Sequence, residues 1–247
     1  MVGRPDNLPC GLFFFTLVTL KTVHITNYYH KTSGGIRTFY LQMIEYANRH
    51  QHSMFLIVPG EKDEVEIIGD YAKIYYVGAM KSPLFDTRYR IIMPWQFMFH
   101  GTRIREILLE EKPDLIEICD KYLVSFLAAM IRKHAFRKLG RPMLVHFSCE
   151  RMDDNIDAFV THSKLGKWAA RRMMGNFNVP LYDFFIAVSP YIADEYFSLG
   201  NYNESLNYFN QQLKQGLAAN AGRTLVFAYF GLGKNYTKLG DSAKAFE

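Results

Sequence analysis

Short apolar runs alternate along this chain with longer segments in which apolar residues recur at helical spacing. The short runs are rich in β-branched and aromatic residues, which favours strands. They occupy residues 22–26, 54–59, 73–77, 114–119, 143–147 and 184–189. Several are apolar almost throughout, as expected for strands that are covered on both faces.

Between most of these strands the apolar positions follow the period of an α-helix. One stripe comprises Ile36, Phe39, Met43, Ile44 and Ala47, and a second comprises Phe97, Ile104, Ile107 and Leu108. Segments 122–139 and 165–174 are further helix candidates. Repetition of strand, helix and strand predicts a parallel sheet with helices on both faces. The predicted fold class is therefore doubly wound α/β over residues 20–195.

Composition and charge narrow the picture only a little. The chain has 247 residues, of which 49% are hydrophobic, so it can bury one substantial core and a small second unit and is not disordered. The formal net charge of +5 suits an anionic ligand or an acidic membrane surface. Lysine and arginine are spread without a dense run, which fits a solvated basic surface equally well, and we predict no nucleic-acid partner.

The cysteines and histidines indicate neither a disulfide framework nor a metal site. Cys10, Cys119 and Cys149 are odd in number, widely separated and not arranged as C-x-x-C, which favours a reducing compartment such as the cytoplasm. His50 and His52 have no third ligand nearby in the sequence, so we predict no bound metal.

The two ends of the chain differ from its middle. Residues 1–19 include an apolar run that is too short to span a bilayer and lacks a small-residue cleavage site, so we interpret them as an extension or a misplaced start. Residues 196–209 and 236–247 repeat at a spacing of forty, which is typical of an α-solenoid, and the second copy resembles a tetratricopeptide repeat. A single amphipathic hairpin is the alternative for residues 196–247.

Gly34 and Gly35 lie between the first predicted strand and the first predicted helix. Ligands of doubly wound folds bind outside the carboxyl ends of the strands, and glycine lets an anion approach the backbone at a helix N-terminus. The spacing alone allows a simple strand-to-helix turn equally well, because it matches neither G-x-G-x-x-G nor a Walker loop.

Four segments in order resemble a known family. They are VHITNYYHKTSGGIRTFYLQMIEYANRHQHSMFLIVPG, EEKPDLIEICD, RPMLVHFSCERMDDN and YDFFIAVSPYIADEY. Together they are similar to the amino-terminal domain of retaining GT-B glycosyltransferases of family four, over about residues 21–195. The resemblance implies a nucleotide-diphosphate sugar as donor substrate, with no other cofactor, and a sugar or lipid as acceptor.

The same resemblance implies roles for two groups of residues. Gly34 and Gly35 correspond to the loop that lies against the donor phosphates or the acceptor. His146 is the nearest match to a histidine beside the reacting sugar and is our candidate catalytic residue; the register also allows Ser148 to occupy that place. A half-buried strand histidine bonded to backbone is the alternative.

Carboxylates follow His146 in the same loop. Glu150, Asp153 and Asp154 are candidates for binding acceptor hydroxyls, with a solvated turn as the alternative. A nucleophile role for Cys149 is disfavoured, because side chains alternate between the two faces along a strand.

The resemblance leads to an expectation of function. GT-B enzymes place most nucleotide-sugar contacts, including a Glu-x7-Glu motif, on a second domain, and no two glutamates of this chain are eight positions apart. We therefore expect a glycosyltransferase, or its amino-terminal half that is inactive alone, in the cytoplasm or at a membrane surface. A non-catalytic module that binds a protein through the helical tail is the alternative, and an oxidoreductase is disfavoured because G-x-G-x-x-G is absent.

Overall fold

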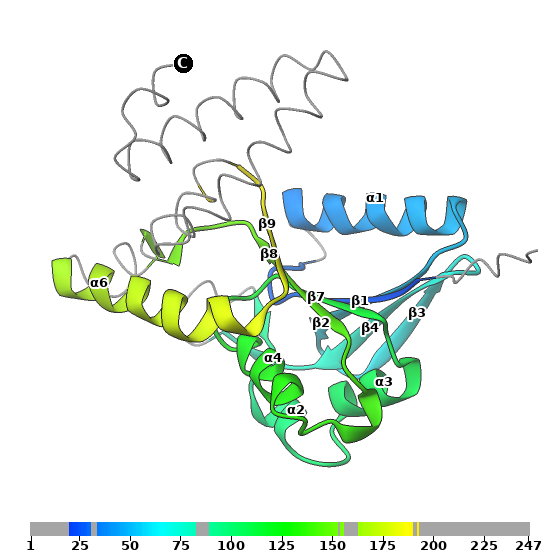
Figure 1. Ribbon diagram of the computed structural model, residues 1–247. Coiled ribbons are helices and arrows are strands. Elements are labelled where there is room, and N and C mark those ends of the chain that lie inside the picture. Colours follow the sequence, from blue (N-terminus) through cyan, green and yellow to red (C-terminus); the bar gives the residue numbers. More distant parts are fainter. Residues whose placement is uncertain are drawn as a thin grey trace, which may run out of the picture.

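The computed structural model describes residues 20–30, 34–82, 89–152, 154–155, 163–189 and 192. In this part of the chain a seven-stranded sheet has the order β3-β4-β2-β1-β7-β8-β9 (Figure 1). Its strands are β1 (Lys21–Ile25), β2 (Ser53–Gly60), β3 (Glu64–Ile68), β4 (Ala72–Gly78), β7 (Leu115–Ile118), β8 (Met143–Ser148) and β9 (Phe184–Ala187). A separate two-stranded ribbon consists of β5 (Met80–Lys81) and β6 (Arg90–Ile91).

The central strand β1 pairs in parallel with β2 on one side and with β7 on the other. From β1 the chain builds the sheet outward through β2 and β4, then crosses back to β7 and continues through β8 to β9. The direction of winding thus reverses between β1 and β7, and such a switch point leaves a crevice at the carboxyl ends of the strands. The predicted, mostly parallel α/β architecture is confirmed.

One strand departs from the predicted parallel sheet. β3 runs antiparallel to β4 at the edge of the sheet, and its residues are mostly exposed. The sequence EVEII combines charged and apolar residues, because an edge strand in contact with water does not need the continuous apolar run of a strand covered on both faces.

The helices are α1 (Gly35–Arg49), α2 (Trp95–Met98), α3 (Arg103–Glu111), α4 (Ser125–Arg132) and α6 (Lys164–Met173), with short turns η1 (Arg137–Leu139), η2 (Met174–Asn178) and η3 (Val179–Leu181). The second predicted stripe is divided between α2 and α3, because Gly101 between them has a left-handed φ of 77°. The helix predicted over 122–139 is shorter than expected and ends before His134, which also has a positive φ.

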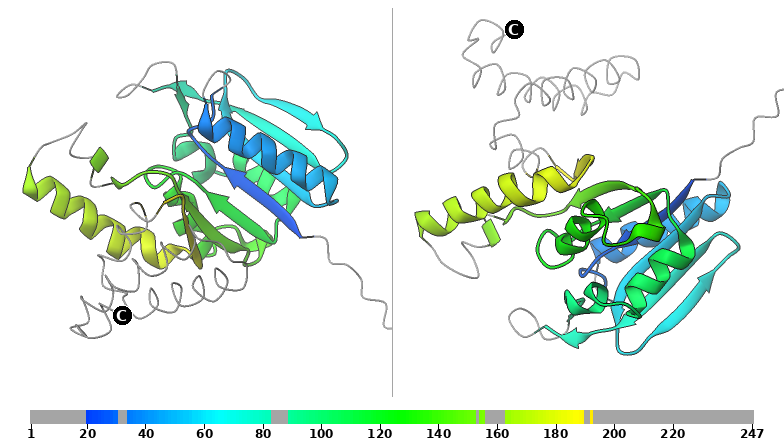
Figure 2. Two further views of the ribbon diagram at one scale, coloured as in Figure 1. Left: turned by 90° about the horizontal axis from the view of Figure 1, so that it is seen from above. Right: turned by 60° about the horizontal axis from the view of Figure 1, so that its bottom comes forward.

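Both faces of the sheet are covered, as predicted. Figures 1 and 2 show α1 on one face and α2, α3 and α4 on the other. On the α1 face, Tyr40, Ile44 and Ala47 pack in one cluster with apolar residues of β2 and β4. On the opposite face, Ile104, Ile107 and Leu127 pack in a larger cluster with the other side of the sheet. The alternating burial of the central strands therefore fixes which residues face each helix layer.

The predicted extension over residues 1–19 and the predicted repeats over 196–247 lie outside the described residues. Within the described part, no helix is long and apolar enough to cross a lipid bilayer.

Candidate functional site

The crevice at the switch point is held together by Asn27, which follows β1. Its Nδ2 donates a hydrogen bond to Asp120 Oδ2 at 2.9 Å, and its Oδ1 accepts one from the backbone N–H of Ile92 at 2.7 Å. Asn27 and Asp120 are both buried. One amide side chain thus joins the loops that follow β1, β6 and β7.

Asp120 organises the start of the segment that leads into α4. Its Oδ1 accepts the backbone N–H groups of Tyr122 at 2.9 Å and Val124 at 3.0 Å. Burial raises the pKa of Asp120, although the hydrogen bonds from Val124 and Asn27 partly offset that effect. With this set of donors around it, the carboxylate fixes the wall of the crevice instead of facing solvent.

Glu150, a predicted acceptor-binding residue, lies against the same crevice. The hydroxyl of Tyr28 donates to Glu150 Oε1 at 2.7 Å, and Lys121 Nζ donates to the Glu150 carbonyl oxygen. Burial and the nearby charges of Asp120 and Glu150 raise the pKa of Tyr28, so its phenol stays protonated and acts as a donor. The loops after β1, β7 and β8 therefore converge on Glu150.

Asp154, another predicted acceptor carboxylate, is not brought into this arrangement. Asp154 is about half exposed, and its Oδ2 lies 3.7 Å from Nε of Arg151 in an i,i+3 ion pair. Asp153 lies outside the described residues. An acceptor contact for either residue stays a prediction.

Gly34 and Gly35 stand at the exposed start of α1. Gly34 is the N-cap with φ of −78°, so its conformation does not require glycine. No atom of the described residues lies within 4 Å of a Cβ added to either glycine. Neither positive φ nor close packing among the described residues requires glycine at these positions, and a ligand contact at the pair stays a prediction.

Arg37 adds a positive charge to the first turn of α1, which holds no acidic residue. Its Nε is inaccessible to solvent and has no hydrogen-bond partner among the described residues. A helix N-terminus that carries an additional guanidinium is suited to an anion.

His146, the candidate catalytic residue, lies in the interior. It pairs with Ile118 of β7 and Phe185 of β9 and is fully buried, with ring centroids 5.0 Å from Tyr182 and 5.9 Å from Phe185. Burial, together with the charge of Lys121, lowers the pKa of His146 to about 3, so its ring is neutral. The structure thus places it as a core histidine of β8, and its contact with a reacting sugar stays a prediction.

Ser148, the alternative match for the family histidine, is also buried. Its hydroxyl donates to the carbonyl oxygen of Glu150 at 3.2 Å. Neither register therefore presents an exposed side chain at the end of β8.

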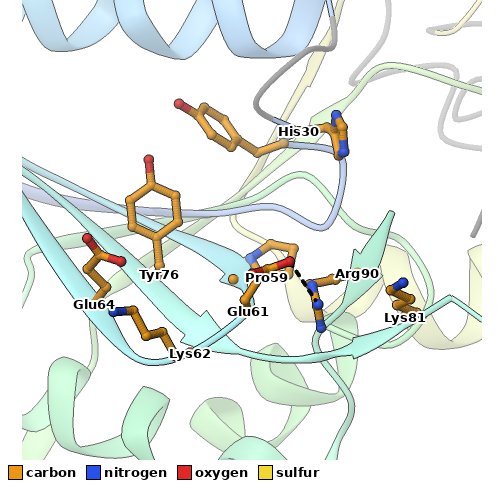
Figure 3. A pocket seen from close by; sticks show the side chains of 10 residues that line it. His30, Pro59, Glu61, Lys62, Glu64, Tyr76, Lys81 and Arg90 are labelled. Atoms are coloured by element: carbon orange, nitrogen blue, oxygen red, sulfur yellow. Dashed lines mark hydrogen bonds and ion pairs between the residues drawn. The ribbon is translucent and has the colours of Figure 1, made fainter. Parts of the chain in front are cut away.

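A pocket of about 770 Å³ lies next to the crevice along the carboxyl edge of the sheet (Figure 3). It is lined by Tyr29, His30, Pro59, Gly60, Glu61, Lys62, Glu64, Tyr76, Lys81 and Arg90. Arg90 is held by Glu61 at 3.2 Å and by the carbonyl oxygen of Ala79 at 2.7 Å. Aromatic rings beside charged donors and acceptors make this pocket suitable for a hydroxyl-rich ligand.

Gly60 shapes the floor of this pocket. A Cβ at this position would lie 2.8 Å from the Cβ of Tyr76 and 3.0 Å from the Lys62 carbonyl oxygen, so a side chain does not fit. The sequence motifs did not indicate this pocket, although the Pro-Gly pair at the end of a predicted strand is a signal for it. Within the described residues no three His, Cys, Asp or Glu side chains gather as metal ligands.

Comparison with known proteins assigns this geometry to a family. The model of Glycosyltransferase Family 4 matches residues 33–205, which is more than half of the chain. Two curated relatives are the GDP-mannose-dependent alpha-(1-6)-phosphatidylinositol dimannoside mannosyltransferases of Mycobacterium tuberculosis strains H37Ra and CDC 1551. Each is 23% identical over 184 residues, which cover 74% of this chain but 44% of the relative. No solved structure matches the chain. The chain belongs to glycosyltransferase family 4.

Proposed function

We propose that this chain forms the acceptor side of a cleft in which a sugar passes from a nucleotide-diphosphate sugar to a sugar or lipid acceptor. The observation that carries the proposal is the pocket at the carboxyl ends of β2 and β4, beside the loop after β1, in a family 4 domain. The chain spans 44% of the length of its curated relatives, so the activity of a whole enzyme is part of the proposal.

Two groups of residues at the carboxyl edge of the sheet bind the two substrates, one group the donor and the other the acceptor. The start of α1, with Gly34, Gly35 and Arg37, offers backbone N–H groups and a cation to the donor phosphates. The pocket beside Tyr76, together with Glu150, binds acceptor hydroxyls. Transfer requires that charge developing on the leaving diphosphate meets preorganised donors, which an open helix N-terminus supplies.

The donor proposal is tested by ligand-induced stabilisation. The curated relatives are named GDP-mannose-dependent, so we take GDP-mannose as the first donor and a UDP-sugar as the comparison. A donor at 100 times its Kd stabilises a protein by about 2.7 kcal/mol, which raises the Tm by several degrees. Millimolar GDP-mannose should therefore raise the Tm of the chain.

Two substitutions in α1 make that test specific. Gly35→Asp places a carboxylate at the helix start and should abolish the shift in Tm, whereas Gln42→Asp, at an exposed position of the same helix, should retain it. An absent shift in the unmodified chain, or an equal loss in both variants, would contradict donor binding at the start of α1.

An exposed face of α6 supports contact with a membrane surface. Leu165 and Trp168 lie one helical turn apart and are 71% and 60% exposed, with Arg172 one turn further on. The opposite side of α6 is buried through Ala170, which packs in a small cluster with Met152 and Met174. Apolar residues flanked by cations on an exposed helix are typical of helices that bind acidic membrane interfaces.

Membrane contact is measured by sedimentation with vesicles that contain or lack an anionic lipid. Trp168→Ser should reduce binding to the anionic vesicles, and added salt should weaken it. Trp95→Ser is the matched control, because Trp95 is 51% exposed on α2. Equal binding to neutral vesicles, or an equal effect of both substitutions, would count against α6 as the contact.

A further inference from the structure

Two thiols that are far apart in the sequence meet at the carboxyl edge of the sheet. Cys119 directly follows β7 and Cys149 directly follows β8. These strands are parallel neighbours, with Ile118 paired to His146. The two Sγ atoms lie 3.6 Å apart, and both cysteines are free.

The two thiols differ in their access to solvent. Cys119 is 1% exposed, whereas Cys149 is only partly buried. The hydrogen bond with Cys149, together with burial, raises the pKa of the Cys119 thiol, so Cys119 keeps its proton. An oxidant from solvent therefore reaches Cys149 first, and the buried Cys119 lies next to it as the second thiol.

We propose that Cys119 and Cys149 form a reversible oxidation site that a hydroperoxide converts into an intramolecular disulfide. The Cys149 thiol loses its proton, its sulfur attacks the peroxide and gains the hydroxyl group as sulfenic acid, the O–O bond breaks, and the released oxygen takes up the lost proton and leaves as alcohol or water. The sulfur of Cys119 then attacks the Cys149 sulfur, the S–O bond breaks, and water leaves with the Cys119 proton. Two thiols lose two electrons in total, and one peroxide bond is reduced.

A disulfide has a sulfur separation of about 2.05 Å, so the two Sγ atoms, which lie 3.6 Å apart, must come closer through rotation of side chains in the loops after β7 and β8. The bond would join the residues immediately before Asp120 and Glu150, the two carboxylates that receive hydrogen bonds from Asn27 and Tyr28. Oxidation would thus tie together two walls of the crevice.

The first experiment needs no substrate and is independent of the proposed transfer. The folded chain is treated with hydrogen peroxide, remaining thiols are alkylated, and peptides are identified by mass spectrometry with and without dithiothreitol. We expect a reducible Cys119–Cys149 linked peptide and an oxidised chain whose Tm is higher by roughly 5–10 °C, because the bond closes a loop of about thirty residues in the unfolded state.

Cysteine variants distinguish this pairing from general oxidation. Cys10→Ser should retain the linked peptide, and Cys149→Ser, at a partly buried position, should abolish both the peptide and the rise in Tm. Cys119→Ser should leave Cys149 as a sulfenic acid that a dimedone probe captures. Overoxidation of Cys149 in the unmodified chain without a linked peptide, or a linkage that involves Cys10, would overturn the proposal.

Discussion

The buried carboxylate of Glu117 gives the sharpest test of the folded core. Glu117 lies in β7 and is 4% exposed beneath α1. Its Oε1 accepts a hydrogen bond from the hydroxyl of Tyr40 at 2.7 Å, and its Oε2 lies 2.8 Å from Nδ1 of His24. The substitution Tyr40→Phe removes one oxygen atom and leaves Oε1 without its donor.

The size of the effect follows from the charge and burial of the acceptor. A hydrogen bond to a charged group contributes about 1.5–3 kcal/mol to the free energy of unfolding. A buried acceptor that loses its donor stays removed from water without a partner, which destabilises the folded state. Tyr40 is fully buried, so water cannot replace its hydroxyl without rearrangement. For a domain of this size the Tm of Tyr40→Phe should fall by roughly 3–12 °C.

Urea unfolding and thermal melting measure the difference directly. Tyr46→Phe is the matched control, because Tyr46 lies on the same helix and is 59% exposed, and it should change the free energy of unfolding by less than about 0.5 kcal/mol. A Tyr40→Phe variant as stable as the unmodified chain, or one no weaker than Tyr46→Phe, would refute the role assigned to this hydrogen bond.

Two further predictions concern the pocket and the buried histidine. Gly60→Ala should lower the free energy of unfolding by about 1–3 kcal/mol in urea, because its Cβ would clash with Tyr76, while Gly34→Ala should be close to neutral. Burial lowers the pKa of His146 to about 3, so between pH 6.5 and 3 the unfolded chain binds a proton at this histidine that the folded chain does not bind. The free energy of unfolding therefore falls as the pH falls through this window. From pH 7 to pH 5 the free energy of unfolding should fall by about 2 kcal/mol because of His146. The variant His146→Gln should lack this part of the pH dependence, whereas the control His100→Gln, at an exposed position, should retain it.

Much of the architecture could be predicted because local patterns report local burial. The apolar run at β2 and the helical stripe of α1 each reveal a covered face without knowledge of their neighbours. Predictions failed where a residue-level detail overrode the pattern. The extended backbone of Phe99 ends α2 before the left-handed Gly101, and the exposed edge strand β3 lacks a buried run. The boundaries of such elements depend on backbone conformation and solvent contact, which periodicity does not report.

The candidate site was predictable in outline and not in detail. The carboxyl ends of the parallel strands β1, β7 and β8 lie at one edge of the sheet, so the placement of both Gly34 and Glu150 at that edge follows from the fold class. The depth of His146 does not follow, because burial at the end of a strand depends on Tyr182 and Phe185 from a later part of the chain. The pairing of Cys119 with Cys149 was hidden by their thirty-residue separation.

Local patterns in the sequence predict most of the strands and helices, the two apolar faces of the sheet and the glycine pair at the start of α1, because these depend on neighbours within a few residues. Which strands are adjacent, and in which register, depends on the tertiary structure. That choice brings Asn27 to Asp120, Tyr28 to Glu150 and Cys119 to Cys149. Such contacts depend on long-range pairing, whose energy is shared among many residues and is therefore not visible in any one segment.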